Sequence, residues 1–224
     1  MEKLKKWNFQ DSNHMNKKFK TASIYDKSAE MYAEKFSKPT EHLEEFFKLL
    51  PRKAKLLDVG CGTGTNAAYA ASKGYRITAI DSSEKMIRIA KNRNPRIDFR
   101  LGDMRSVRTD AEKFDGIIAS YSLIHIPKNE LRRIINKLSS MLSRKGAIYI
   151  SIHTGKSQEI FMDIPTIRAK SLFLNIMTTG ETKGLLESAD LEIVVAHERF
   201  PQKNKIGFNK LFIIAIKKDE KRHL

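Results

Sequence analysis

Three glycines at alternate positions follow a short apolar run, and this spacing is typical of a site that binds a nucleotide. Residues 55–66 read Lys-Leu-Leu-Asp-Val-Gly-Cys-Gly-Thr-Gly-Thr-Asn, with one acid, Asp58, inside the run. Gly60, Gly62 and Gly64 permit the positive φ angles of a tight reversal, and the missing Cβ atoms let a ligand lie against backbone N–H groups. We interpret the stretch as strand, glycine turn and helix. An ordinary strand-to-helix turn has similar glycines, so a second signal is needed.

A carboxylate at the end of the next apolar run supplies that signal. Residues 76–81 read Arg-Ile-Thr-Ala-Ile-Asp and end 17 positions beyond Gly64. In nucleotide-binding folds an acid at the end of the second strand accepts hydrogen bonds from ribose hydroxyls. Asp81 is therefore a candidate for that role, and the two signals together favour a nucleotide-like ligand.

The elements that must position these residues alternate between strands and helices. Apolar runs predict strands at residues 55–59, 76–81, 97–101, 114–120 and 147–152, with helices at 65–73, at 83–92 and from Pro127 to Gly146. This alternation predicts a doubly wound, mostly parallel Rossmann-like α/β sheet that binds ligands at the carboxyl ends of its strands. Further polar residues fall at those ends: Gly102, Asp103, Ser120 and His153.

The two ends of the chain have different patterns. Residues 1–20 are polar and Lys-rich and predict a mobile or loosely docked arm. A capping box at residues 23–26 and an apolar face formed by Tyr25, Ala29, Tyr32, Ala33 and Phe36 predict a helix, and Thr40 is expected to cap a second helix that stops at Pro51. Two tyrosines on the first face fit either a helix docked on the core or a lid whose phenols line a pocket.

The tail is expected to close the sheet with an antiparallel hairpin. After a short helix at residues 182–189, two β-rich runs at 191–197 and 210–217 are joined by a polar loop. Residues 219–224 form a charged end, and residues 154–180 match no pattern. We therefore divide the chain into an arm and lid helix at residues 1–38 and a main part at residues 39–224, within a single domain overall.

Length and composition agree with one cytoplasmic α/β domain. The chain has 224 residues, of which 41% are hydrophobic, enough for one core. No apolar run approaches the ~18 residues of a membrane span, and the N-terminus lacks the apolar stretch of a signal peptide. The single cysteine, Cys61, has no partner at a metal-ligand spacing, so we expect no disulfide framework and no metal site.

The net charge of +16 raises the question of a nucleic-acid partner. The excess of basic over acidic residues is 5 in residues 1–55, 8 in residues 56–153 and 3 in residues 154–224. A dedicated nucleic-acid site would concentrate this charge, whereas here it is spread along the chain. Solvated Lys-rich faces are the favoured interpretation, and RNA binding stays open as the alternative.

Several motifs together resemble the class I S-adenosylmethionine (SAM)-dependent methyltransferases, of the small-molecule type near the ubiquinone and menaquinone biosynthesis enzymes. The matching stretches lie at residues 25–32, 57–64, 80–86, 101–104, 114–120, 122–127 and 142–146, so the resemblance covers about residues 25–217. It departs from the family in one turn, where Lys145-Gly146 stands for the usual Pro-Gly. The resemblance implies an enzyme that transfers a methyl group from SAM and releases S-adenosylhomocysteine.

The resemblance also implies roles for individual residues. The backbone of the glycine turn should approach the methionyl part of SAM, Asp81 should take the ribose hydroxyls, and Asp103 should accept a hydrogen bond from the adenine amino group. Polarizable methionines should pack on the adenine faces. The implied cofactor-binding set is Tyr25, Tyr32, Gly60, Cys61, Gly62, Asp81, Ser82, Met86, Asp103, Met104 and Ser120.

Other functions compete with this interpretation. Read from Gly62, the glycine stretch also satisfies the G-x-G-x-x-A form of a dinucleotide site. The motif of amino-methylating DNA enzymes is missing after the fourth predicted strand, and so is the nucleophilic cysteine of cytosine-C5 enzymes. A small-molecule acceptor is favoured, with a tRNA or RNA methyltransferase and a non-catalytic SAM-binding protein as alternatives. The acceptor, the methylated atom and the oligomeric state are not determined.

Methyl transfer from a sulfonium needs alignment and exclusion of water more than it needs a catalytic base. For a hydroxyl acceptor a base within hydrogen-bond reach would help, and two histidines follow predicted strands. His125 lies after the fourth strand and His153 after the fifth. Both are weak candidates, so the catalytic residue is left unassigned.

Overall fold

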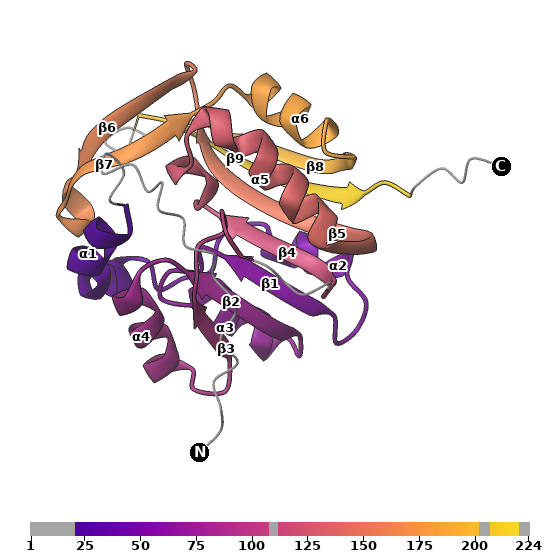
Figure 1. Ribbon diagram of the computed structural model, residues 1–224, viewed down its shortest axis with the longest axis horizontal. Coiled ribbons are helices and arrows are strands. Elements are labelled where there is room, and N and C mark those ends of the chain that lie inside the picture. The colour runs from indigo at the N-terminus through magenta and orange to yellow at the C-terminus, as the bar shows by residue number, and fades with distance from the viewer. Residues whose placement is uncertain (1–20, 108–111, 202–206, 220–224) are drawn as a thin grey trace.

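The computed structural model describes residues 21–107, 112–201 and 207–219 (Figure 1). The predicted arm at residues 1–20 and most of the charged C-terminal end lie outside these ranges. The helices are α1 (Thr21–Lys35), α2 (Leu43–Lys48), α3 (Thr65–Ser72), α4 (Glu84–Arg93), α5 (Lys128–Met141) and α6 (Thr179–Glu187), with short 3₁₀ helices η1 (Leu123–His125) and η2 (Pro165–Ile167). The strands are β1 (Lys55–Val59), β2 (Arg76–Asp81), β3 (Asp98–Leu101), β4 (Phe114–Ser120), β5 (Leu142–Thr154), β6 (Gln158–Ile164), β7 (Ala169–Ile176), β8 (Leu191–Arg199) and β9 (Asn209–Lys217).

The main sheet has seven strands in the order β3-β2-β1-β4-β5-β9-β8. Strands β1 to β5 pair in parallel, and β9 and β8 join the β5 edge in antiparallel fashion. The predicted parallel, doubly wound sheet with a C-terminal antiparallel hairpin is therefore confirmed. The strand order reverses between β1 and β4, and a ligand is expected outside the carboxyl ends of the strands at this point.

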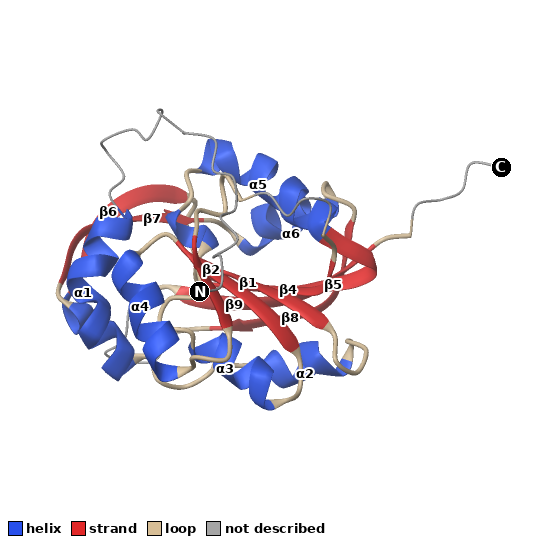
Figure 2. Ribbon diagram, turned by 60° about the horizontal axis from the view of Figure 1, so that its bottom comes forward, coloured by secondary structure: helices blue, strands red, loops and turns tan. Residues whose placement is uncertain are grey.

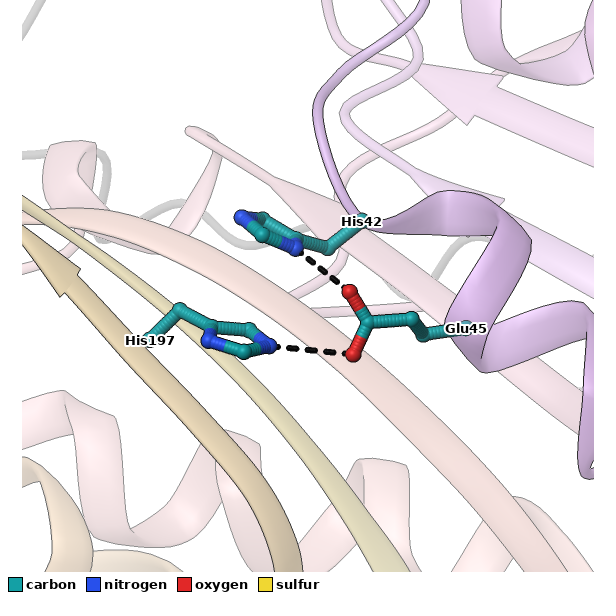
Figure 3. Close-up of side chains that lie close together, drawn as sticks. All are labelled: His42, Glu45 and His197. Carbon is teal, nitrogen blue, oxygen red and sulfur yellow. Dashed lines mark hydrogen bonds and ion pairs between the residues drawn. The ribbon is translucent and has the colours of Figure 1, made fainter.

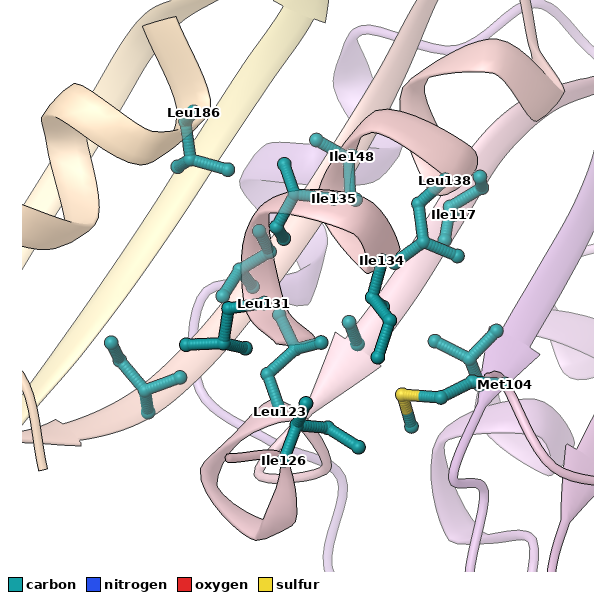
Figure 4. Close-up of a cluster of buried hydrophobic side chains, with 14 of the residues drawn as sticks. Met104, Ile117, Leu123, Ile126, Leu131, Ile134, Ile135, Leu138, Ile148 and Leu186 are labelled. Atoms are coloured by element: carbon teal, nitrogen blue, oxygen red, sulfur yellow. The ribbon is translucent and has the colours of Figure 1, made fainter. Parts of the chain in front are cut away.

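Each face of the sheet has its own apolar core, because side chains alternate between faces along a strand. In β5, Ile148, Ile150 and Ile152 pack in one core, whereas Ala147 and Tyr149 pack in the other. The first core also takes the buried faces of α5 and α6 (Figure 4). The second core takes α2, α3 and α4 on the opposite side of the sheet (Figure 2). Coverage of both faces explains why β1 and β4 are mostly apolar, with one acid in each strand, Asp58 and Asp115.

The end of α5 differs from the prediction. The helix ends at Met141, and Leu142 already pairs with Phe114 as the first residue of β5. Gly146 lies inside this strand next to a shift in register, and a Cβ atom there would lie 3.1 Å from the carbonyl oxygen of Phe114 and 2.9 Å from that of Ser143. The glycine thus permits a close backbone approach at a bulge, and the prediction that it ends the helix was wrong.

Residues 154–180, which match no sequence pattern, contain a second sheet. Strands β6 and β7 pair with each other in antiparallel fashion and form a two-stranded ribbon beside the main sheet (Figure 1). The following helix, α6, begins three residues earlier than predicted because Thr178 and Glu181 form a reciprocal capping box. Strand β7 of this ribbon contacts η1 and α1 and so adds a layer of chain beside them, whereas α6 contacts α5 and β8.

Both predicted caps near the N-terminus were wrong. Helix α1 already contains residues 23–26, and the Asp26 carboxylate instead accepts hydrogen bonds from the Ser83 hydroxyl at 2.6 Å and the Lys85 N–H at 3.1 Å. Asp26 therefore caps α4 and ties α1 to it. Helix α2 begins after His42, and the hydroxyl of Thr40 bonds that of Ser120 at 2.7 Å instead of capping a helix. Among the described residues, no helix is long and apolar enough to span a bilayer.

Candidate functional site

A pocket lies at the carboxyl ends of β1 to β4 and is covered by α1. The empty space within it is about 750 Å³ when the space open to solvent at its mouth is included. The predicted site residues that line it are Tyr25, Tyr32, Gly60, Gly62, Asp81, Ser82, Met86, Asp103, Met104, Ser120 and His125. Residues far apart in the sequence thus meet where the strand order reverses.

The glycine turn forms the floor of this pocket. Gly60, Gly62 and Gly64 all have positive φ, at 72°, 54° and 81°. A Cβ atom on Gly60 would lie 2.4 Å from that of Ser122, and one on Gly62 would lie 3.3 Å from the ring of Tyr32. The first two glycines therefore serve both the backbone conformation and the close approach of neighbouring elements.

Asp81 holds this turn against β2. Its two carboxylate oxygens accept the Gly62 N–H at 2.8 Å and the Ser83 N–H at 2.9 Å. Burial raises the pKa of Asp81, and the two backbone hydrogen bonds oppose that shift. The carboxylate lines the pocket and has acceptor positions beyond these two bonds, because an ionised carboxylate offers about four lone-pair sites. It is placed to accept from a ligand.

Asp58 is a buried acid without a partner. It is 1% exposed, and within the described part of the chain neither carboxylate oxygen has a hydrogen-bond partner. Burial, reinforced by the nearby Asp81, raises its pKa to about 8. The charge of Asp58 also acts on Tyr32, which lines the pocket. An unsatisfied acid in this position would be stabilised in its ionised form by a cationic ligand.

The end of β3 brings a third acid to the pocket. Asp103 accepts the Arg105 N–H at 2.8 Å and pairs with the Arg105 guanidinium at 2.5 Å. A ligand donor at Asp103 must therefore share the carboxylate with Arg105. Nearby, the side chains of Met86 and Met104 are 1% and 9% exposed and give the pocket an apolar wall.

A tyrosine and a histidine meet on the side of the pocket nearest β7. The Tyr25 hydroxyl and Nε2 of His125 are 2.8 Å apart, and Nδ1 of His125 lies 2.9 Å from the Phe173 carbonyl oxygen. A carbonyl only accepts, so Nδ1 carries the proton and Nε2 accepts from the tyrosine. Burial lowers the pKa of His125 to about 4, so the imidazole is neutral at pH 7.

Two predicted residues do not line the pocket. Cys61 packs beside the second core, and burial raises the pKa of its thiol. His153 packs against the Tyr121 ring, with 5.1 Å between ring centroids, and burial followed by the charge of Lys210 lowers its pKa to about 4. His153 is thus one residue removed from the pocket wall and is a poorer candidate base than His125.

Six pocket residues were missing from the predicted set: Thr21, Gly102, Arg105, Tyr121, Ser122 and Ile126. Tyr121 and Ser122 follow directly after Ser120 at the end of β4, so their positions at a strand end were a usable signal. Both have buried hydroxyl oxygens without a hydrogen-bond partner in the described part of the chain. Thr21 had no such signal, because its place depends on how α1 docks.

The central part of the chain matches a known family. Residues 56–146 match the family model described as methyltransferase domain. An uncharacterised methyltransferase of Alkaliphilus oremlandii is 32% identical over 103 residues, which cover 46% of this chain and 47% of that protein. A ubiquinone biosynthesis O-methyltransferase of Coxiella burnetii is 31% identical over 100 residues, which cover 43% and 42%. The chain spans about half the length of the curated relatives it matches.

Solved structures share the fold over 79–89% of this chain at low sequence identity. A SAM-dependent methyltransferase of Methanosarcina mazei has a TM-score of 0.70 at 21% identity and covers 79% of this chain and 98% of its own. A 1,6-didemethyltoxoflavin N1-methyltransferase of Burkholderia thailandensis has a TM-score of 0.59 at 22% identity, covering 89% and 80%. The [4+2]-cyclase SpnF has a TM-score of 0.70 at 18% identity, covering 88% and 94%. These matches confirm the resemblance to class I methyltransferases in fold and in the central domain.

Proposed function

We propose, from the methyltransferase domain at residues 56–146 and the class I fold, that the chain transfers a methyl group from SAM to a small-molecule acceptor. The observation that carries the proposal is the convergence in one pocket of the glycine turn and the carboxylates at the ends of β2 and β3. The apolar methionine wall and the tyrosines of α1 complete this pocket. Each of these groups has a matching part in SAM.

The pocket fits SAM in its charge. Asp58 lies in β1 two residues before the glycine turn, and its buried oxygens have no hydrogen-bond partner among the described residues; SAM carries a sulfonium and an ammonium group that would compensate such a charge. Gly62 is buried beneath the ring of Tyr32, and a Cβ atom there would lie 3.3 Å from that ring, so the turn and the tyrosine of α1 approach closely. The residues present therefore suit a cationic ligand that also carries a ribose and an adenine.

The residue roles follow from the same chemistry. In this proposal Asp81 binds the ribose diol, Asp103 accepts from the adenine amino group while paired with Arg105, and Met86 and Met104 pack on the ring faces. Gly60 and Gly62 face the methionyl part, near Asp58. Ser82 and Ser120 complete the polar wall. Cys61 is part of the glycine turn, but its side chain packs beside the second core and does not contact the ligand. In the same proposal residues 1–38 are the arm and lid helix, and residues 39–224 are the main part of a single domain.

SAM, when bound, supplies a methyl group already activated by the positive charge on sulfur. The chain mainly has to align the acceptor and exclude water. Tyr25 and Tyr32 lie over the pocket and would exclude water once α1 is closed. For a hydroxyl acceptor, the neutral Nε2 of His125 can hold the acceptor's proton, either directly or through the Tyr25 hydroxyl.

A small-molecule acceptor is supported by the relatives and by the charge distribution. The named relative from Coxiella acts in ubiquinone biosynthesis, and the neighbour from Burkholderia binds 1,6-didemethyltoxoflavin and S-adenosylhomocysteine. The excess of basic residues is spread over the chain and does not mark one nucleic-acid surface. A cytoplasmic location is part of the same proposal. The fold alone does not decide the reaction, since one neighbour is a cyclase.

Label transfer tests the proposal. The full chain is incubated with methyl-labelled SAM and, separately, with the small-molecule fraction and the total tRNA of a cell extract, and products are identified by mass spectrometry. We expect label in a small molecule, and none with an Asp81→Ala control. Label in tRNA would support the RNA methyltransferase instead. SAM binding without any labelled product from either fraction would support a non-catalytic SAM-binding protein.

A further inference from the structure

Two histidines and a glutamate from distant parts of the chain meet on the surface between α2 and β8 (Figure 3). Nδ1 of His42 lies 2.6 Å from one carboxylate oxygen of Glu45, and Nε2 of His197 lies 3.0 Å from the other. All three potential ligand atoms lie within 4.8 Å of one another. We call these residues the His42–Glu45–His197 cluster, and none of them lines the pocket described above.

Glu45 differs from the acids next to it in its partners. Glu41 pairs with Arg199 at 2.9 Å, and Glu44 pairs with Lys73 at 2.5 Å, so each has a permanent cation. The ion pairs of Glu45 are with histidines, which are charged only when protonated. With neutral imidazoles the cluster keeps one full negative charge on a chain whose net charge is +16. Such a site attracts a cation.

The arrangement of the two imidazoles favours one metal ion bound by both rings over protonation of both rings. The rings are stacked at 4.2 Å between centroids with 18° between their planes. Two protonated rings this close would repel each other, whereas a metal ion binds neutral imidazoles and needs no proton on either coordinating nitrogen. His42 stands at the N-cap of α2 with a positive φ of 65°, and its side chain bonds the Glu45 carboxylate and does not cap the helix backbone.

We propose that the His42–Glu45–His197 cluster binds a divalent transition-metal ion of the zinc class. Two imidazoles and one carboxylate are a ligand set that suits Zn²⁺, and the partly exposed side chains leave room for water as a further ligand. The stacked rings must turn about their side-chain bonds to point both nitrogens at one ion. The exposed fractions of the two side chains, 28% and 44%, leave room for this rotation.

The ion would join the start of α2 to the edge strand β8. His42 lies directly before α2 and Glu45 in its first turn, only three residues apart, whereas His197 is 152 positions from Glu45. That separation explains why no sequence spacing indicated a metal, and why the sequence predicted none. The His42 ring also contacts Phe212 of β9, at 5.0 Å between centroids, so the bound ion would fix α2 against the hairpin.

Metal titration of the full chain, made without a histidine tag and treated with a chelator, tests the proposal. Co²⁺ is followed by its visible absorption and Zn²⁺ by calorimetry. We expect one ion per chain and a higher melting temperature in excess Zn²⁺. Glu45→Gln and His197→Ala should each weaken binding at least about 10-fold, the lower limit seen for removal of even an outer-shell partner. Glu44→Gln, on the same helix, should leave binding unchanged.

Two outcomes would overturn the proposal. One is equal Zn²⁺ affinity in the wild type, Glu45→Gln and His197→Ala, since the ion would then bind elsewhere on the chain. The other outcome is that no variant binds Zn²⁺ and that the melting temperature depends on pH in the wild type but not in Glu45→Gln. The cluster would then consist only of hydrogen bonds from the two histidines to the Glu45 carboxylate. Circular dichroism of each metal-free variant verifies that the fold is kept. None of these readouts depends on methyl transfer.

Discussion

Binding of SAM should release a proton from Asp58. This acid is buried and has no hydrogen-bond partner among residues 21–107, 112–201 and 207–219, and burial raises its pKa from 3.8 to about 8. A cationic ligand near the glycine turn favours the ionised carboxylate and so lowers the pKa. The neutral isostere Asp58→Asn cannot release this proton.

The pKa sets the size of the effect. With a pKa of about 8, Asp58 is about 90% protonated at pH 7, so a complex that holds it ionised releases about 0.9 proton at pH 7 and about 0.5 at pH 8. By linkage, SAM affinity should rise nearly tenfold per pH unit below about pH 7 and level off above pH 8. Without ligand, the folded state binds more protons than the unfolded state between about pH 4 and pH 8, so the unfolding free energy should fall as pH rises through this window.

Calorimetry in two buffers of different ionisation enthalpy measures the released protons directly. We expect the buffer-dependent heat to vanish in Asp58→Asn, with near-ultraviolet circular dichroism confirming that the variant is folded. Burial also raises the pKa of Asp81, and the Asp58→Asn variant separates the two acids because it removes only the proton of Asp58. The reasoning would be refuted if SAM binding at pH 7 took up protons or released none, or if the wild type and Asp58→Asn released the same number.

Three further expectations follow. Gly64→Ala should lower the free energy of unfolding, measured in urea, by at least about 1–2 kcal/mol, because φ is 81° and the new Cβ would lie 2.6 Å from the Phe99 ring. The control Gly184→Ala lies on α6, where a Cβ meets no other atom, and should raise the free energy of unfolding by up to about 1 kcal/mol. Hydrogen exchange in residues 25–36 should slow when S-adenosylhomocysteine is added, and equal protection with and without it would mean that α1 is ordinary core packing. Affinity for tRNA should be weak, and submicromolar binding with a steep salt dependence would contradict this.

The sheet was predictable because its strands obey local rules. The bounds of β1, β2 and β4 agree with the prediction, since each is a short, nearly continuous apolar run between turn signals. The candidate pocket was predictable in large part for the same reason: parallel strands bring their carboxyl ends to one edge, so Gly60, Asp81 and Ser120 had to meet.

The remainder depends on contacts between distant residues. Asp26 caps α4 across 57 positions, and no local pattern distinguishes this from a cap on its own helix. Gly146 has the same appearance in the sequence whether it ends a helix or permits a bulge in β5. Arg105 joins the pocket through its pairing with Asp103, and His153 leaves it because Tyr121 lies between. Such outcomes are set by packing, which the periodicity of one segment does not encode.

The central claim is that the glycine turn and Asp81 hold SAM and not a dinucleotide. Calorimetric titration of the full chain with SAM and with NAD tests it most directly. We expect SAM to bind one to one and NAD to show no binding. Asp81→Ala should weaken SAM by roughly 1.5–3 kcal/mol, or about 10-fold to 150-fold, since it removes hydrogen bonds to a buried carboxylate. Tight NAD binding with no SAM binding would contradict the claim.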